Sequence, residues 1–243
     1  MFDAGAVASY VIFTPPVVST VGRGASSEAL AFFGHGMRTH IYVDGFNLYY
    51  RALKGTPFKW LDLAALFRTV LQPRHDIRKI KYFTARVSAR PNDPSQPQRQ
   101  DVYLRALRRH CPEVEVHLGH FLSHRVQAPL AHPGNRPRMV DIIKTEEKGS
   151  DVNLAVHLLN DGWLNAYDCA IVVSNDSDIA EAMRLVKKHN DKKIGLITPG
   201  SSHPSRRLMA HADFSRHLRK GALQGNQLPS PIPGTNLTKP PSW

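Results

Sequence analysis

From residue 38 onward, short apolar stretches alternate with longer segments in which apolar residues recur every three or four positions. The short stretches are typical of strands buried on both faces of a sheet, and the longer segments are typical of amphipathic helices. We expect strands at 40–44, 77–86, 114–122, 168–174 and 193–198. We expect helices at 46–53, 61–71, 98–110, 151–164, 178–189 and 206–220, with a loop rich in Pro, Gly and Arg at 129–138.

The order of these elements predicts the fold class. Strands that alternate with helices favour parallel strands joined by helical crossovers. We therefore predict an α/β protein with a three-layer fold, in which a mainly parallel central sheet is flanked by helices. In such sheets the ligand site lies beyond the carboxyl ends of the strands, so the residues that follow strands are the first candidates for chemistry.

The two ends of the chain lack this periodic pattern. Residues 1–36 are small, rich in Ser, Gly and Val and nearly uncharged, and Met37 stands directly before the first strand. We predict a disordered N-terminal extension at 1–36, which is either native or the product of an upstream start. Residues 221–243 contain five prolines and are predicted to be a disordered tail. The folded domain is then expected at 37–220.

Charge indicates the kind of partner. The net charge is +12, with ten Lys or Arg against three acids in 74–110 and six against one in 201–243. This balance favours a polyanion such as RNA or DNA, although a merely basic protein is the plainer alternative. Helical spacing places Arg105, Arg108 and Arg109 on one stripe, and Arg216, Arg219 and Lys220 on another. We expect these stripes to contact phosphates, Arg105 and Arg109 first among them.

Other composition features narrow the setting. Two cysteines outside any metal-ligand spacing suit a reducing compartment, and no apolar stretch approaches the ~20 residues of a membrane-spanning helix. We expect a cytoplasmic protein with no membrane partner, and a homodimer is left open. His117, His120 and His124 alternate without a Cys pair, which is typical of solvent-facing positions rather than of a zinc site.

Four acids fall where the strand rule places a site. Asp44 ends the first strand, Asp176 and Asp178 follow the strand at 168–174, and Asp151 opens a helix. Crowded carboxylates repel one another unless a cation neutralises them, and Mg²⁺ or Mn²⁺ takes carboxylate oxygens as ligands. Such a cation would polarise a phosphoryl oxygen and activate water for in-line attack. The acids therefore predict a metal-dependent phosphodiesterase site.

Each acid also has a plainer explanation. Asp44 can simply end a strand in a turn with Gly45, and Asp151 can complement the dipole of its helix. Asp178 and Glu181 form a capping-box pattern, so Asp178 can serve only as a helix cap. Two acids two residues apart at a strand end are harder to explain in this way, and the combination of all four favours a shared site.

Three motifs in this order resemble those of NYN-domain proteins, which are similar to PIN nucleases. They are the opening motif at 41–48, IYVDGFNL; the central helix motif at 147–155, EKGSDVNLA; and the late strand motif at 172–178, VVSNDSD. The resemblance covers roughly residues 38–200. It implies a PIN-like fold and a nuclease that depends on Mg²⁺ or Mn²⁺ and usually acts on RNA.

The resemblance also implies roles for individual residues. Asp44, Asp151, Asp176 and Asp178 would be metal ligands or would position the attacking water, which makes them, with Asn47, the expected catalytic set. Side chains expected to hold the site or contact substrate are those of Asn47, Ser174, Asn175, Lys148, Arg105 and Arg109. Some family members carry another acid near the position of His157, where this chain has none. A second metal would therefore be bound weakly or not at all.

Three rival functions match parts of this pattern. A phosphatase of the haloacid-dehalogenase type needs a second Asp two residues after the first, and Phe46 stands there. A dinucleotide-binding domain needs a glycine-rich turn, and Gly45 stands alone. The serious alternative is a non-catalytic RNA-binding protein with a PIN-like fold, which would present the same basic surface without cutting.

Overall fold

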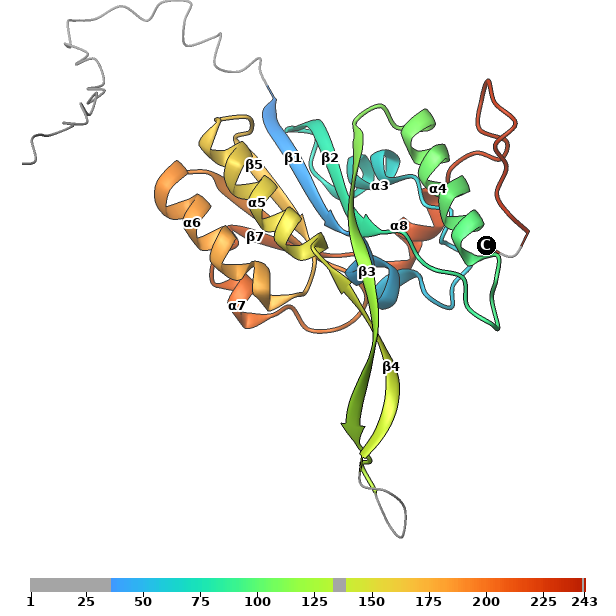
Figure 1. Ribbon diagram of the computed structural model, residues 1–243. Helices are drawn as coiled ribbons and strands as arrows, with labels where there is room; N and C mark the ends of the chain where they lie inside the picture. Colours follow the sequence, from blue (N-terminus) through green and yellow to red (C-terminus); the bar gives the residue numbers. More distant parts are fainter. Residues whose placement is uncertain (1–35, 133–138, 242) are drawn as a thin grey trace, which may run out of the picture. The chain divides into compact units, whose positions relative to one another are not determined.

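The protein is described by a computed structural model that covers residues 36–132, 139–241 and 243 (Figure 1). Its centre is a seven-stranded sheet with the order β4-β3-β2-β1-β5-β6-β7. All neighbouring strands run parallel except β3 and β4. The strands are β1 Met37–Asp44, β2 His75–Ala85, β3 Val114–Pro129, β4 Met139–Lys148, β5 Cys169–Val173, β6 Lys193–Thr198 and β7 Phe214–His217. The expectation for residues 1–36 falls outside the described residues, Gly36 apart.

Helices cover both faces of this sheet, as Figure 1 shows. Because side chains alternate along a strand, Ile41 and Val43 enter one apolar core while Tyr42 enters the other. The first core lies under α3 and α4, and the second under α5 and α6. The predicted three-layer α/β fold with a mainly parallel sheet is confirmed. The helical segments are α2 Gly45–Leu48, the π-helix η1 Tyr49–Leu53, α3 Leu63–Val70, α4 Gln96–His110, α5 Ser150–Trp163, the 3-10 helix η2 Ser177–Ile179, α6 Ala180–Asn190, α7 Arg206–Met209 and α8 Lys220–Gly225.

A buried ion pair fixes α5 on the sheet. Asp161, in the last turn of α5, accepts hydrogen bonds from Lys81 Nζ of β2 and from the Tyr42 hydroxyl of β1, both at 2.6 Å. Asp161 and Lys81 are each only 7% exposed. Removing one partner of such a pair would leave an uncompensated buried charge, so the contact is expected to hold strongly. The opposite end of the same helix, which begins at Ser150, is thereby directed to the carboxyl edge of the sheet.

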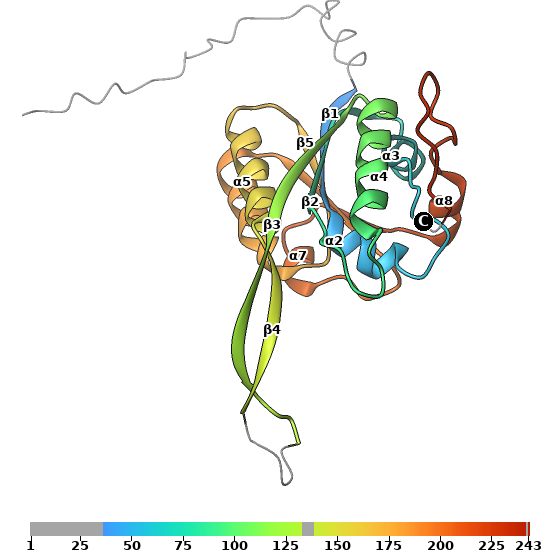
Figure 2. The same ribbon diagram turned by 45° about the vertical axis from the view of Figure 1, so that its right-hand side comes forward.

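The largest departure from the sequence prediction is a long ribbon. Instead of ending at 122, β3 continues to Pro129 and pairs with β4 from His120–Lys148 to Pro129–Met139. This ribbon projects beyond the carboxyl ends of the parallel strands (Figures 1 and 2). Most of its side chains are exposed on both faces. No buried face imposes an alternating apolar pattern there, which explains why the sequence predicts no strand at 123–128 or 139–148. Of the loop expected at 129–138, residues 133–138 fall outside the described residues.

The basic helix predicted at 206–220 is wrong. The segment forms α7, then the edge strand β7, and only then α8. Phe214 pairs in register with Gly195 of β6, and the Asp213 carboxylate accepts the Ile194 amide at 2.7 Å. Arg216 therefore lies on a strand while Lys220 begins the next helix, so the predicted second stripe does not exist. Within the described residues, no helix is long and apolar enough to cross a membrane.

The expectation of a disordered tail at 221–243 is also wrong. Leu223, Leu228 and Ile232 are buried in the same core as the residues under α3. The Leu228 amide donates to the Trp60 carbonyl at 2.8 Å, and Figure 2 shows α8 beside α3. Prolines space these apolar residues irregularly, and a periodicity argument therefore misses a segment that packs without regular structure. The folded unit extends well past residue 220.

Truncation after residue 220 tests this correction. It removes three buried aliphatic side chains, each contributing about 1.5–3 kcal/mol. The thermal midpoint should fall by about 10 °C or more in differential scanning calorimetry. The double substitution Leu228→Ala with Ile232→Ala should reproduce most of the loss, whereas Gln224→Ala, an exposed position on α8, should not. A truncated chain that melts like the full one would restore the disordered-tail prediction.

Candidate functional site

The site is built on the contact between two neighbouring parallel strands. β1 and β5 pair in register at Val43 and Val173, so Asp44 and Ser174 leave the sheet side by side. Both are buried, Asp44 to 4% exposure, and the Ser174 hydroxyl donates to Asp44 Oδ2 at 2.8 Å. This bond fixes one carboxylate oxygen of Asp44 at the carboxyl edge of the sheet.

The turn after β1 fixes the other oxygen. Asp44 is the N-cap of α2, and its Oδ1 accepts the Asn47 amide at 2.9 Å. Gly45 packs against β2 so closely that a Cβ there would lie 2.7 Å from the Phe83 carbonyl oxygen. Asn47 Oδ1 in turn accepts the Asn175 amide at 3.0 Å and ties α2 to the segment after β5. The plain turn role of Asp44 is therefore real, but it does not account for the bond from Ser174.

The segment after β5 is ordered by its own polar groups. The Asp176 amide donates to the Ser174 hydroxyl at 3.0 Å, and Asp176 Oδ1 accepts the Asp178 amide at 3.0 Å. Asp176, rather than Asp178, therefore caps the helical turn that follows, and the predicted capping box of Asp178 is not formed. Asn175 is held by the His203 carbonyl and the Ser205 amide, at 3.0 and 2.6 Å.

Asp151 lies at the same edge of the sheet, on the face covered by α5. It lies in the first turn of α5, whose N-cap is Gly149. Glu147 completes the turn, since its carboxylate accepts the Ser150 amide at 3.1 Å and the Ser150 hydroxyl at 2.7 Å. Glu147 therefore sits beside Asp151, at the point where β4 ends and α5 begins.

The carboxylates perturb one another. Burial chiefly raises the pKa of Asp44, with Asp176 adding to the effect, while the bonds from Asn47 and Ser174 oppose it. Burial raises the pKa of Asp151 to about 6, and the negative charges of Asp44, Asp176, Glu147 and Asp178 contribute in that order. These carboxyl groups therefore carry unneutralised repulsion at neutral pH.

One small cavity brings three of the four predicted acids together. Asp44, Asp151 and Asp176 line it, with a volume of about 310 Å³, and Asn47 and Ser150 line it too. We call this the acidic cavity. Its other lining residues are Phe46, Tyr50, Arg51, Phe121 and Glu147.

The remaining predicted residues lie elsewhere. Asp178 is exposed and lines a neighbouring hollow with Glu181 and Arg207. Lys148 is exposed at the end of β4 and pairs with Glu146 at 3.3 Å. Arg105 and Arg109 are on α4, as predicted, but they line a separate surface hollow beside residues 235–237. These two arginines do not line the acidic cavity.

Two charged residues that line the acidic cavity were missed by the sequence prediction. Glu147 belongs to the motif at 147–155, but its role depends on the hydrogen bond that it accepts from the Ser150 amide, which the sequence does not show. Arg51 projects from η1, where nothing in an exposed helical position distinguishes it from a surface arginine. It donates to the Ser202 hydroxyl at 3.1 Å, which holds the guanidinium beside the acids.

The donor set fits a hard divalent cation in its chemistry. The cavity offers carboxylate oxygens from Asp44, Asp151 and Asp176 whose repulsion a cation would relieve. In the described part of the chain, however, no three His, Cys, Asp or Glu side chains are grouped closely enough to hold an ion as they stand. Binding would thus draw the acids closer together.

The raised pKa of Asp151 makes a prediction about stability. Folding favours its protonated form, so ionising it costs stability as pH rises from about 3.8 through about 6. In EDTA, Asp151→Asn should exceed the wild type in unfolding free energy at pH 7.5 by about 1–2 kcal/mol, the shift being discounted for partial exposure. This advantage should disappear near pH 4 in urea titrations. Asp141→Asn, on the exposed ribbon, is the matched control; an advantage independent of pH would contradict the account.

Comparison with known proteins identifies the family of this chain. The NYN domain family matches residues 38–218. The chain is 36% identical over 237 residues to 6-hydroxy-3-succinoylpyridine 3-monooxygenase HspA of Pseudomonas putida, covering 85% of this chain and 75% of that protein. A crystal structure of a Vibrio parahaemolyticus protein of unknown function is similar with a TM-score of 0.47 and 19% identity, over 77% of this chain and 96% of that one. The match spans both strand ends and the start of α5, and the chain belongs to the NYN domain family.

Proposed function

We propose that this protein is a metal-dependent ribonuclease that hydrolyses phosphodiester bonds with Mg²⁺ or Mn²⁺ in the acidic cavity. The carrying observation is the convergence of Asp44, Asp151 and Asp176 on one cavity, with the pKa of Asp151 raised by burial and then by its acidic neighbours. The NYN domain family is nuclease-related, which supports the same reaction class. Crowded carboxylates whose negative charges repel one another are suited to binding a cation.

The chain's own residues supply orientation. The Ser174 hydroxyl and the Asn47 amide hold both oxygens of Asp44, so its carboxylate would need little reorganisation to bind a cation. A bound Mg²⁺ or Mn²⁺ would supply charge stabilisation at the phosphoryl oxygen and lower the pKa of the attacking water. Arg51 lines the cavity and can contact a phosphate. Lys148 is exposed and directly follows the lining residue Glu147 in the chain, so it lies at the edge of the cavity. Asp178, which lies outside the cavity, would act at longer range.

The choice of RNA over DNA is part of the proposal. The net charge of +12 favours a polyanion, and the basic face of α4 offers further phosphate contacts at Arg105 and Arg109. Both cysteines are free and buried, which suits a reducing compartment, and we place the activity in the cytoplasm. Binding of RNA without cutting is the competing outcome of the same experiment.

A second candidate function comes from the relative's name. That protein is named for oxygenation of a substituted pyridine, a reaction that consumes O₂ and two electrons from a reductant. The observation in its favour is a cleft lined by aromatic and basic side chains that adjoins the acidic cavity. Hydroxylated product formed from 6-hydroxy-3-succinoylpyridine, O₂ and a reductant would support this function.

Cleavage assays test the nuclease directly. Purified full-length protein should cut labelled RNA in Mg²⁺ or Mn²⁺ and not in EDTA. Asp176→Asn should lower the rate about 100-fold or more, because the cavity loses a negative ligand, and Asp44→Asn should do the same. Asp178→Asn should have a smaller effect, and Asp141→Asn on the ribbon should have none.

Melting curves identify any variant that fails to fold, and Asp176→Asn is the safer test because Asp44 is buried whereas Asp176 is only partly buried. Equal rates for Asp176→Asn and the wild type would rule out the acidic cavity as the cutting site. Binding of RNA with no cleavage in either metal would favour the non-catalytic alternative. Faster cleavage of DNA than of RNA would support nuclease activity but contradict RNA as the substrate.

A further inference from the structure

A second, larger cleft adjoins the acidic cavity. It has a volume of about 640 Å³ and lies between η1, the start of α4 and the base of the ribbon. Three side chains line both spaces: those of Phe46, Tyr50 and Phe121. A molecule in the cleft therefore lies next to the carboxylates. We call this space the aromatic cleft.

Aromatic rings dominate its lining. At the shared border, Phe46 packs edge-on against Phe121 with ring centroids 5.7 Å apart, and Tyr50 lies 6.5 Å from Phe46. Tyr103 and Trp243 also line the cleft and form a pair 5.2 Å apart. Rings presented on several sides of one space are suited to stacking or edge contacts with a planar aromatic ligand.

Cations outnumber acids in the same lining. Lys59, Arg90 and Arg99 are present, and Asp93 is the one acid among the lining residues that the structure describes. Asp93 is already engaged by Arg99 at 2.5 Å. Burial, together with the positive charges of Arg99 and Lys239, lowers the pKa of Lys59, so these cations repel one another. An anionic group in the cleft would relieve that repulsion. Arg90 is exposed, and within the described part of the chain its guanidinium forms no ion pair.

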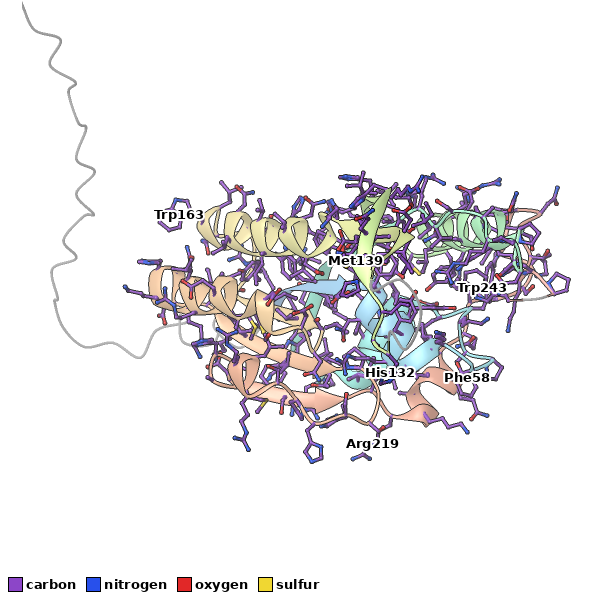
Figure 3. All side chains as sticks on the ribbon, turned by 60° about the horizontal axis from the view of Figure 1, so that its bottom comes forward. Phe58, His132, Met139, Trp163, Arg219 and Trp243 are labelled. Carbon is purple, nitrogen blue, oxygen red and sulfur yellow. The ribbon has the colours of Figure 1, made fainter. Side chains whose placement is uncertain are left out.

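Trp243 contributes a further polar group. Its indole N–H is buried and has no acceptor among the described residues. Leaving such a donor unsatisfied costs free energy that a ligand acceptor would recover. Figure 3 labels Trp243 on the same side of the molecule as Phe58 and α4. Lys59 lies over the Trp243 ring with its Nζ 5.9 Å from the centroid, which brings the cation and the ring together.

We propose that the aromatic cleft binds a planar heteroaromatic ring that carries an anionic group. The rings of Tyr50, Phe46 and Phe121 would contact the heterocycle, and Arg90 and Lys59 would contact the anion. A nucleotide and a small aromatic carboxylic acid share this chemistry. The inference concerns binding alone, and it stands whether or not the acidic cavity cuts phosphodiesters.

Titration calorimetry on the full-length protein in EDTA tests the cleft. The probes are uridine 5′-monophosphate and pyridine-3-carboxylate, with uridine and pyridine as their uncharged counterparts. At least one charged probe should bind with a Kd below about 1 mM, and its uncharged counterpart should bind about 10-fold more weakly. Arg90→Gln should weaken the charged probe by a similar factor, because it removes one cation from the lining.

Two further variants make the test specific. Arg74→Gln, an exposed arginine just before β2 that lies outside the cleft and outside the predicted basic stripes, is the matched control and should bind like the wild type. Trp243→Ala should weaken binding, with melting curves to confirm folding, because it removes a wall of the cleft. Tighter binding of the nucleotide would identify a nucleic-acid subsite, and tighter binding of the pyridine acid a metabolite site.

Binding of neither charged probe would overturn the proposal, as would affinities unchanged in both Arg90→Gln and Trp243→Ala. These results are independent of cleavage, since the titrations contain no metal and no scissile bond. Cleavage of RNA without binding of either probe would support the proposed function and contradict the ligand site in the aromatic cleft. Binding of a charged probe without cleavage would support the ligand site and contradict nuclease activity.

Discussion

The parallel pairing of β1 with β5 is the constraint on which the site depends. It places Asp44 beside Ser174, and the hydrogen bond between them joins two segments that are 130 residues apart in the chain. Asn47 adds a second link from α2 to Asn175. The first link satisfies buried polar groups and the second partly buried ones, so the acids are held by the same bonds that close the carboxyl edge of the sheet. Disturbing this pairing would therefore displace both Asp44 and Asp176.

The third acid arrives by a different route. Asp151 depends on the direction of α5, which is anchored at its far end by Asp161 against Lys81 and Tyr42. The near end is set by Glu147, which closes the first turn at Ser150. One helix thus carries a fully paired carboxylate at one end and an unneutralised one at the other. Burial acts to raise the pKa of Asp161, but hydrogen bonds from His40, Lys81 and Tyr42 outweigh it and lower that pKa. The pKa of Asp151 is raised instead. This contrast distinguishes a structural acid from a candidate metal ligand.

Sequence pattern predicted the parts of the fold whose burial is regular. The strand ending at Asp44 and the strand Lys193–Thr198 are buried in the sheet, and the order of elements fixed their parallel arrangement. It failed where burial is irregular or absent. The ribbon is exposed on both faces, and the segment carrying Leu228 packs through scattered apolar residues. In the site, the acids at strand ends could be predicted because topology gathers them, whereas the grouping of Glu147 and Arg51 depends on side-chain directions that no spacing rule supplies. The role of each acid remains a prediction. The neighbouring aromatic cleft combines residues between 45 and 145 with Trp243, a grouping that no sequence pattern indicates.

The central claim is that the acidic cavity collects a divalent cation, and Mn²⁺ titration monitored by electron paramagnetic resonance tests it most directly. The account predicts saturable uptake by the full-length protein, weakened about 10-fold or more in Asp176→Asn and unchanged in Asp141→Asn. Uptake should fall as pH drops below about 6, where Asp151 becomes protonated. An absence of saturable uptake, or equal uptake by Asp176→Asn and the wild type, would contradict it.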